Sequence, residues 1–184
     1  YNIVLLDRDA PALAAAGERL PDALRLPIDI ANPQAGGQVA AAIKGHFGRL
    51  DCLVNNAGVA DFGPIEACDA TTWRRVMDTN LDGMFYLSQA LTPLLRETRG
   101  CLVNIASISG LRASTLRVAY GTSKAAVMHL TQQQAVELGE YGIRANCVAP
   151  GPVRTKLAMA VHTQEIIDAY HDAIPLNRYG TERD

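Results

Sequence analysis

Short apolar runs alternate with longer amphipathic segments along the whole chain. Runs such as NIVLLD at 2–7 and LVNIA at 102–106 are nearly continuous and do not alternate with polar residues. This pattern is typical of parallel strands that are buried on both faces. It predicts an α/β fold with a doubly wound parallel sheet and right-handed helical crossovers. The expected strands are 2–7, 23–30, 50–58, 100–107 and 143–151, and the expected helices are 9–19, 32–48, 69–98 and 117–140, followed by a mostly helical segment at 156–175.

Local signals predict where two of these helices begin or bend. Asn32 and Pro33 are typical of an N-cap and a first helical residue, so we expect the second helix to begin there. The third helical segment is too long for one ordinary helix. Asp82–Gly83 and Pro93 predict a break or a kink within it.

Composition narrows the possible functions. The 184 residues suffice for a single domain, 1–184, with a sizeable core. The net charge of −2 provides no basic face, so nucleic acid is not an expected partner. No apolar run approaches the ~20 residues that span a bilayer, and the N-terminal segment is too short for a signal-peptide core. We therefore expect a cytoplasmic protein that does not enter a membrane.

The spacing of cysteine and histidine gives no sign of a metal site. No two cysteines form a CxxC pair, and no two histidines have ligand spacing. Most of the cysteines lie in apolar, strand-like runs, so we expect buried free thiols in a reducing compartment. The cysteines in such runs are Cys52, Cys101 and Cys147.

Polar or backbone-shaping residues directly follow the expected strands. In a doubly wound sheet, ligands bind beyond the carboxyl ends of the strands. We therefore expect these residues to form a binding site, with Tyr120 reaching it from the next helix. The residues that follow the strands are Asp7, Asp29, Asn55–Gly58, Ser107 and Pro150–Thr155.

Tyr120 and Lys124 are four residues apart in the segment AYGTSKAAV. On a helix, this spacing places both side chains on one face. A free tyrosine has a pKa of about 10, and a nearby ammonium favours the phenolate and lowers that pKa. The two side chains could therefore act on the same small molecule. The spacing alone, however, favours a solvent-facing tyrosine packed on a lysine stem.

Four motifs in register resolve that choice. LVNNAG at 53–58, NIASISG at 104–110, YGTSK at 120–124 and VAPGPVRT at 148–155 occur in this order. Together they resemble the short-chain dehydrogenase/reductase family, whose members have a Rossmann-like fold. The resemblance covers essentially the whole chain. It is greatest to bacterial members related to 3-oxoacyl-thioester reductases, sugar dehydrogenases and diol dehydrogenases.

The resemblance implies an oxidoreductase that transfers hydride between a nicotinamide cofactor and an alcohol or carbonyl substrate. Tyr120 matches the family's general acid/base and Lys124 the lysine beside it. Ser107 matches the serine that donates a hydrogen bond to the substrate oxygen. Asn80 matches the asparagine that links Lys124 to solvent, although it could instead bond a neighbouring backbone and bend its helix. Ser107 could likewise be an ordinary helix cap.

The same resemblance implies a set of cofactor-binding residues. Asp7 would bind the adenosine ribose and repel a 2′-phosphate, which favours NAD over NADP. Arg8 follows directly and could instead pair with that phosphate, so NADP remains open. The expected cofactor-binding residues are Asp7, Asp29, Ile30, Asn56, Ala57, Gly58, Tyr120, Lys124, Pro150, Gly151, Val153 and Thr155.

The chain departs from the family pattern at both ends. The first strand with its glycine-rich turn and the last strand have no counterpart, so we expect a gap between the strands at 2–7 and 50–58. Two alternatives to the main function remain open. One is an NADP-dependent reductase of 3-oxoacyl thioesters, and the other is a catalytically silent scaffold on the same fold.

Substrate and assembly are less defined by the sequence. The 156–175 segment resembles the family's substrate lid, and the helices at 84–95 and 117–140 are apolar on more than one face. In the resembling family these helices pack across a two-fold axis. We therefore expect a homodimer or homotetramer, with Leu91 and Val127 in the interface. The candidate wall residues are Lys156, Met159, His162, Ile108 and Leu111.

Overall fold

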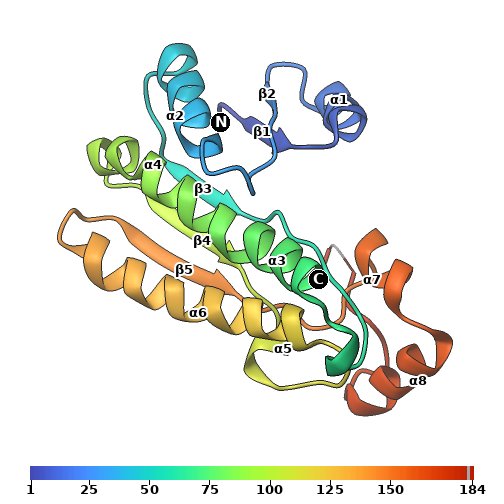
Figure 1. The fold of residues 1–184 in the computed structure, drawn as a ribbon. Coiled ribbons are helices and arrows are strands. Elements are labelled where there is room, and N and C mark those ends of the chain that lie inside the picture. The colour runs from blue at the N-terminus through green and yellow to red at the C-terminus, as the bar shows by residue number, and fades with distance from the viewer. Residues whose placement is uncertain (182) are drawn as a thin grey trace.

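The computed structural model describes residues 1–181 and 183–184, with the backbone alone at 156, 157 and 161. Short parallel strands form two separate sheets, one of two strands (β1-β2) and one of three (β3-β4-β5) (Figure 1). Hydrogen bonds join neighbours within each sheet, but no pairing between β1 and β3 is found among the described residues. The strands are β1 (Val4–Asp7), β2 (Leu24–Pro27), β3 (Cys52–Asn55), β4 (Cys101–Ile105) and β5 (Arg144–Val148).

Helices connect the strands as crossovers, and this confirms the predicted α/β class. The long helices α2, α4 and α6 lie side by side along the chain's two sheets (Figure 1). The helices are α1 (Ala10–Arg19), α2 (Ala35–His46), α3 (Ala70–Met77), α4 (Gly83–Thr98), α5 (Ile108–Leu111), α6 (Val118–Gly139), α7 (Lys156–Val161) and α8 (Gln164–Ala173), with short η turns at Ile65–Ala67 (η1) and Asp78–Asp82 (η2).

The two sheets share one hydrophobic core. Leu87, Leu91 and Leu94 of α4 pack against Val39 and Ile43 of α2. The two helices can approach closely because Gly36 has no side chain. A Cβ at this position would lie only 2.6 Å from the backbone oxygen of Tyr86. This contact holds the β1-β2 unit beside the larger sheet, so that the carboxyl ends of all strands border one site.

One predicted helix start was wrong, and one of the two predicted break positions was confirmed. The second helix begins at Ala35, because Asn32 accepts a hydrogen bond from the Gln34 backbone N–H and forms a turn before the helix. Pro93 lies inside α4 without ending it. The break predicted at Asp82–Gly83 is confirmed, because the π-helical turn η2 ends at Asp82 and α4 begins at Gly83.

One face of the β3-β4-β5 sheet is open among the described residues, because α4 and α6 cover only the opposite face. The predicted burial of the thiols was therefore wrong. Cys52 and Cys147 are exposed and Cys101 is half-buried. Val54 and Val148 are also more than half exposed. The continuous apolar runs had predicted that these strands are buried on both faces. That prediction was wrong for this sheet.

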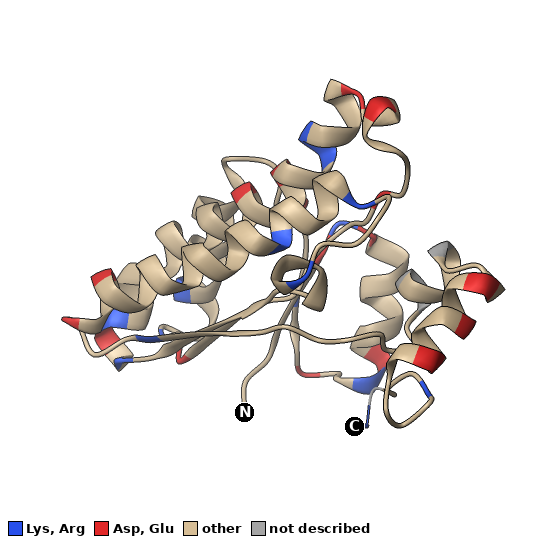
Figure 2. Cartoon of the chain, turned by 90° about the horizontal axis from the view of Figure 1, so that it is seen from below, with Lys and Arg blue, Asp and Glu red and all other residues tan. Residues whose placement is uncertain are grey.

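Charged residues of both signs are spread over the helices and loops (Figure 2), which agrees with the nearly balanced net charge. Within the described residues, no helix combines the length and the hydropathy needed to cross a bilayer.

Candidate active site

A cavity of about 630 Å³ lies beyond the carboxyl ends of the strands. It extends from the end of β1, past the loop after β3, to α6 and α7. All twelve predicted cofactor-binding residues line it, from Asp7 and Asp29 at one end to Thr155 at the other. Of the predicted catalytic residues, Ser107, Tyr120 and Lys124 line the cavity, whereas Asn80 lies behind its wall.

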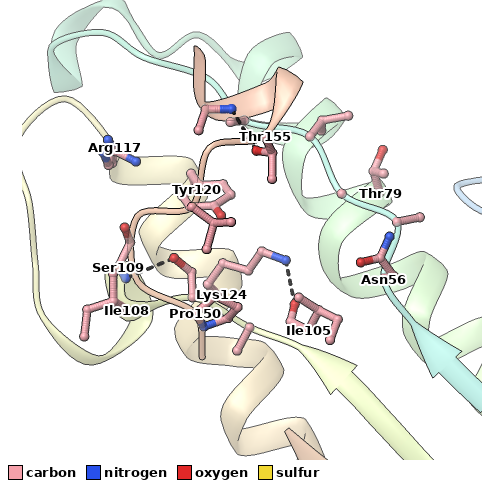
Figure 3. Close-up of a pocket in the computed structure, with 18 of the residues that line it drawn as sticks. Asn56, Thr79, Ile105, Ile108, Ser109, Arg117, Tyr120, Lys124, Pro150 and Thr155 are labelled. Atoms are coloured by element: carbon pink, nitrogen blue, oxygen red, sulfur yellow. Dashed lines mark hydrogen bonds between the residues drawn. The ribbon is translucent and has the colours of Figure 1, made fainter. Parts of the chain in front are cut away.

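Tyr120 and Lys124 lie on the same face of α6 (Figure 3). Lys124 is buried, and its Nζ donates a 2.7 Å hydrogen bond to the backbone oxygen of Ile105 at the end of β4. The same Nζ is 5.8 Å from the ring centroid of Tyr120. Burial lowers the pKa of Lys124 from 10.5 to about 8. The solvent-facing arrangement that the spacing also allowed is not observed.

Ser107 is positioned by the turn from β4 into α5. Its backbone is extended, and its Oγ caps α5 by accepting a hydrogen bond from the Ser109 backbone N–H at 3.2 Å (Figure 3). The residue is therefore a helix cap, as the alternative interpretation proposed. It also lines the cavity, and its hydroxyl hydrogen remains available to a bound molecule because the cap uses only an oxygen lone pair.

Asn80 connects the loop after β3 to α6. Its Oδ1 accepts a hydrogen bond from the Val59 backbone N–H at 2.8 Å, and its Nδ2 donates to the Val59 oxygen at 2.9 Å. The same Nδ2 donates to Ser123 Oγ at 3.0 Å, and Ser123 Oγ donates to the Tyr120 backbone oxygen at 2.7 Å. Asn80 is fully buried in the π-helical turn η2. The alternative in which it bonds a neighbouring backbone therefore describes its observed contacts.

Gly58 allows this loop to pass close to Lys124. A Cβ at Gly58 would lie 3.3 Å from Asn80 Oδ1 and 3.5 Å from Lys124 Nζ. Any side chain there would therefore project toward the ammonium and take up space in the cavity. Asn56 and Ala57 line the same part of the wall.

The opposite end of the cavity carries the acidic residues. Asp7 Oδ1 accepts a hydrogen bond from the Asp9 backbone N–H at 2.9 Å, and Asp29 Oδ1 accepts from the Ala31 N–H at 3.0 Å. Arg8 Nη1 lies 3.4 Å from Asp29 Oδ2, with both side chains about half exposed. This ion pair is weak because solvent screens it.

Sequence reasoning missed a cluster around His162 at the α7 end of the cavity. Arg117 Nη2 lies 2.8 Å from His162 Nε2, and His162 Nδ1 lies 2.9 Å from Tyr179 Oη. The ring of Phe62 lies under the Arg117 guanidinium, with 4.3 Å between Cζ and the ring centroid. Tyr170 packs against His162 as well. The one available signal was the position of Arg117, three residues before Tyr120.

The predicted wall residues divide into two groups. Ile108 and His162 line the cavity. Leu111 and Met159 are exposed and do not line it, so their predicted role was wrong. The side chain of Lys156 lies outside the described part of the structure.

Residues at the two ends of the cavity could bind the two ends of a nicotinamide dinucleotide. Exposed Asp7 at the end of β1 could accept hydrogen bonds from ribose hydroxyls. At the other end, Lys124 Nζ has donors left beyond its bond to Ile105, and Gly58 leaves room beside it. The described residues contain no group of three or more His, Cys, Asp or Glu that could hold a metal ion.

Comparison with known proteins agrees with this geometry. Residues 1–184 match the family profile described as enoyl-(acyl carrier protein) reductase. A meso-2,3-butanediol dehydrogenase from Serratia marcescens is 34% identical over 178 residues, which cover 96% of this chain and 70% of that protein. The chain belongs to the short-chain dehydrogenase/reductase family.

Two further short-chain dehydrogenase/reductase relatives bear on function. An "inactive 2-(S)-hydroxypropyl-CoM dehydrogenase 2" from Xanthobacter autotrophicus is 36% identical over 190 residues, covering 100% of this chain and 83% of that protein. The crystal structure of a gluconate 5-dehydrogenase from Burkholderia cenocepacia in complex with NADP and tartrate has a TM-score of 0.90 at 30% identity. That match covers 97% of this chain and 72% of the other.

Proposed function

We propose that this protein transfers hydride between a nicotinamide cofactor and a small alcohol or carbonyl substrate, with Tyr120 as the general acid and base. One observation carries the proposal. Tyr120, Lys124 and Ser107 come from α6 and the end of β4 and converge on one wall of the cavity. A hydroxyl or carbonyl oxygen bound there would lie between a phenol and a serine hydroxyl.

In the oxidation direction, each of these residues has a separate role. Ser107 donates a hydrogen bond to the substrate oxygen and holds it near Tyr120. Tyr120 Oη takes the hydroxyl proton as the carbinol carbon loses hydride, for which the nicotinamide supplies the acceptor. The ammonium of Lys124 favours the phenolate form of Tyr120. In reduction, Tyr120 returns the proton to the new alkoxide.

Asn80 is a positioning residue in this proposal. Its hydrogen bonds to Val59 and Ser123 fix the loop after β3 against the helix turn that carries Tyr120. The proton relay that the family resemblance implies would pass from Lys124 to solvent at this point of the cavity wall.

We propose NAD as the preferred cofactor. The carboxylate of Asp7 at the end of β1 would accept hydrogen bonds from ribose hydroxyls and repel a 2′-phosphate. Arg8 supports the alternative of NADP only if it leaves Asp29, and their ion pair at 3.4 Å costs little to break. Asp7→Ala should therefore improve the ratio of NADP to NAD efficiency.

The direct test is an assay of the full-length protein against secondary alcohols, sugars and 3-oxoacyl thioesters with each nicotinamide cofactor. NAD-dependent turnover of an alcohol or ketone is the expected result. Turnover restricted to 3-oxoacyl thioesters with NADP would favour the reductase alternative. Cofactor binding without turnover of any substrate would favour a silent scaffold, an outcome to which the inactive relative draws attention.

We further propose a cytoplasmic homodimer formed through α4 and α6, with a tetramer as a second step. The free thiols support a reducing compartment. The interface positions predicted from sequence were wrong, because Leu91 and Val127 are 1% and 0% exposed and belong to the subunit's own core. Phe85 on α4 and Val136 on α6 are 43% and 80% exposed, and they are the better candidates.

A further inference from the structure

Arg117 is the N-cap residue directly before α6, and Tyr120 and Lys124 follow it along the same side of the helix. Their spacing of three and then four residues places all three on one helix face, and all three line the cavity. Lys124 is next to β4, Tyr120 is in the middle, and Arg117 is at the helix N-terminus. Figure 3 shows Arg117 and Asn56 on opposite sides of Tyr120. Arg117 therefore faces the part of the cavity beyond the reacting group.

The guanidinium of Arg117 is held by uncharged partners. It stacks over the Phe62 ring and donates a hydrogen bond to His162 Nε2, which must accept because arginine has only donors. Among the described residues, no carboxylate forms a salt bridge with Arg117. The side chain is half-buried, so solvent screens its charge only in part. A preformed, half-buried guanidinium without an anion is thus presented to the cavity.

The two ends of the cavity differ in charge, although the β1-β2 end also carries Arg8, which is paired with Asp29. Among the described residues, the carboxylates in its lining are Asp7 and Asp29, which lie at the β1-β2 end. Beside Tyr120, the charged lining residues are Arg117 and Lys124, and both are positive. A neutral substrate would leave the Arg117 charge unpaired at this end, whereas an anionic one would neutralise it.

We propose that the substrate is a hydroxy or keto carboxylate whose carboxylate group is bound by Arg117 while its reacting oxygen lies at Tyr120. This inference rests on the proposed function and specifies its substrate class. The planar guanidinium matches a carboxylate with two parallel N–H···O bonds, and its stacking on Phe62 fixes its plane. One guanidinium balances one carboxylate, whereas a phosphate monoester carries up to two charges.

Arg117 has an alternative role that the test must separate. Its bond to His162 could serve only to hold α7 and α8 against α6, because His162 also contacts Tyr179 and Tyr170. Loss of such a clamp would affect every substrate alike. Loss of a carboxylate-binding group would affect only the anionic ones.

The experiment compares matched substrates in the full-length protein. Levulinate and acetoacetate are each paired with their methyl esters, and the oxidation of reduced nicotinamide is followed. Wild-type protein should show a higher kcat/KM for the acid than for the ester. Arg117→Gln should lower the acid's kcat/KM by about 10- to 100-fold, mainly through KM, and change the ester's by less than about threefold. Arg112→Gln, which removes an exposed charge five residues away, should leave the ratio of acid to ester unchanged.

Equal losses for acid and ester in Arg117→Gln would overturn the proposal and make Arg117 a clamp. A wild-type preference for the esters would overturn it as well. A binding measurement keeps it separate from the proposed function. Calorimetry of levulinate with the catalytically blocked Tyr120→Phe protein, loaded with reduced cofactor, should show binding that Arg117→Gln abolishes. If no carbonyl compound is turned over but this binding is found, the proposed function fails and the carboxylate site stands; without binding, the carboxylate site fails.

Discussion

The charge on Lys124 affects Tyr120, and burial affects the charge on Lys124. While charged, it favours the phenolate of Tyr120, but its burial opposes that charge. With a pKa of about 8, it is mostly protonated at neutral pH and loses its proton a little above it. Lys124, which we propose assists proton transfer, is therefore itself close to its titration point in the cofactor-free protein.

We predict that one lysine resonance of the cofactor-free protein titrates with a midpoint of about 8. Nitrogen-detected NMR of lysine side chains measures this directly. The signal should be absent in Lys124→Gln, which assigns it. A midpoint near the ordinary 10.5 would show that Lys124 is solvated in solution.

A second prediction concerns Asn80. Asn80→Ala would leave the backbone N–H and C=O of Val59 without their partner at a partly buried site. We expect the free energy of unfolding to fall by about 1–3 kcal/mol, measured by urea denaturation. Gln89→Ala removes an exposed amide from the neighbouring helix and is the matched control, with an expected change below about 0.5 kcal/mol. Equal stability of the two variants would contradict the observed role of Asn80.

For the helices and strands, the sequence predicted the elements that are determined by residues close together in the chain. Every expected strand is present, although each strand is shorter than its predicted range. Pro93 misled the prediction because packing at Leu91, Leu94 and Leu95 keeps α4 helical despite the missing N–H. The cluster at His162 was not predictable, since Phe62, Arg117 and Tyr179 meet only in the folded chain.

His162 at the end of α7 contacts Arg117, Tyr170 of α8 and Tyr179, and these contacts predict a pH effect. Burial, and then the Arg117 charge, lower the pKa of His162 below 6.5, so the folded state prefers the neutral ring. The unfolded state binds the proton more readily, and stability therefore decreases as the pH falls below about 6.5 toward the lowered pKa. The groups around the ring are Arg117, Tyr170 and Tyr179, and none of them provides a negative charge at this pH.

We expect hydrogen exchange in 156–173 to speed up between pH 7 and pH 5, after correction for intrinsic rates, relative to exchange in α6. His162→Gln should remove most of this pH dependence, because glutamine can bond Arg117 without titrating. An unchanged pH dependence in that variant would assign the effect to another group.

At the scale of the molecule, the proposed dimer tests how the exposed surfaces of α4 and α6 are used. Phe85→Glu together with Val136→Glu should shift light-scattering mass toward the monomer, since both side chains are exposed in the subunit. Leu111→Glu, at another exposed apolar residue, should leave the mass unchanged. A monomeric wild type at micromolar concentration, or a double variant that stays associated, would contradict the proposed interface.

We propose that Tyr120 transfers the proton while the rest of the cavity binds the cofactor. The most direct measurement is the comparison of turnover and cofactor affinity in wild type and Tyr120→Phe, using the full-length protein. We predict that turnover falls by at least about 100-fold, the contribution typical of general acid–base catalysis, while the cofactor Kd changes by less than about threefold. Turnover equal to that of the wild type would contradict the claim.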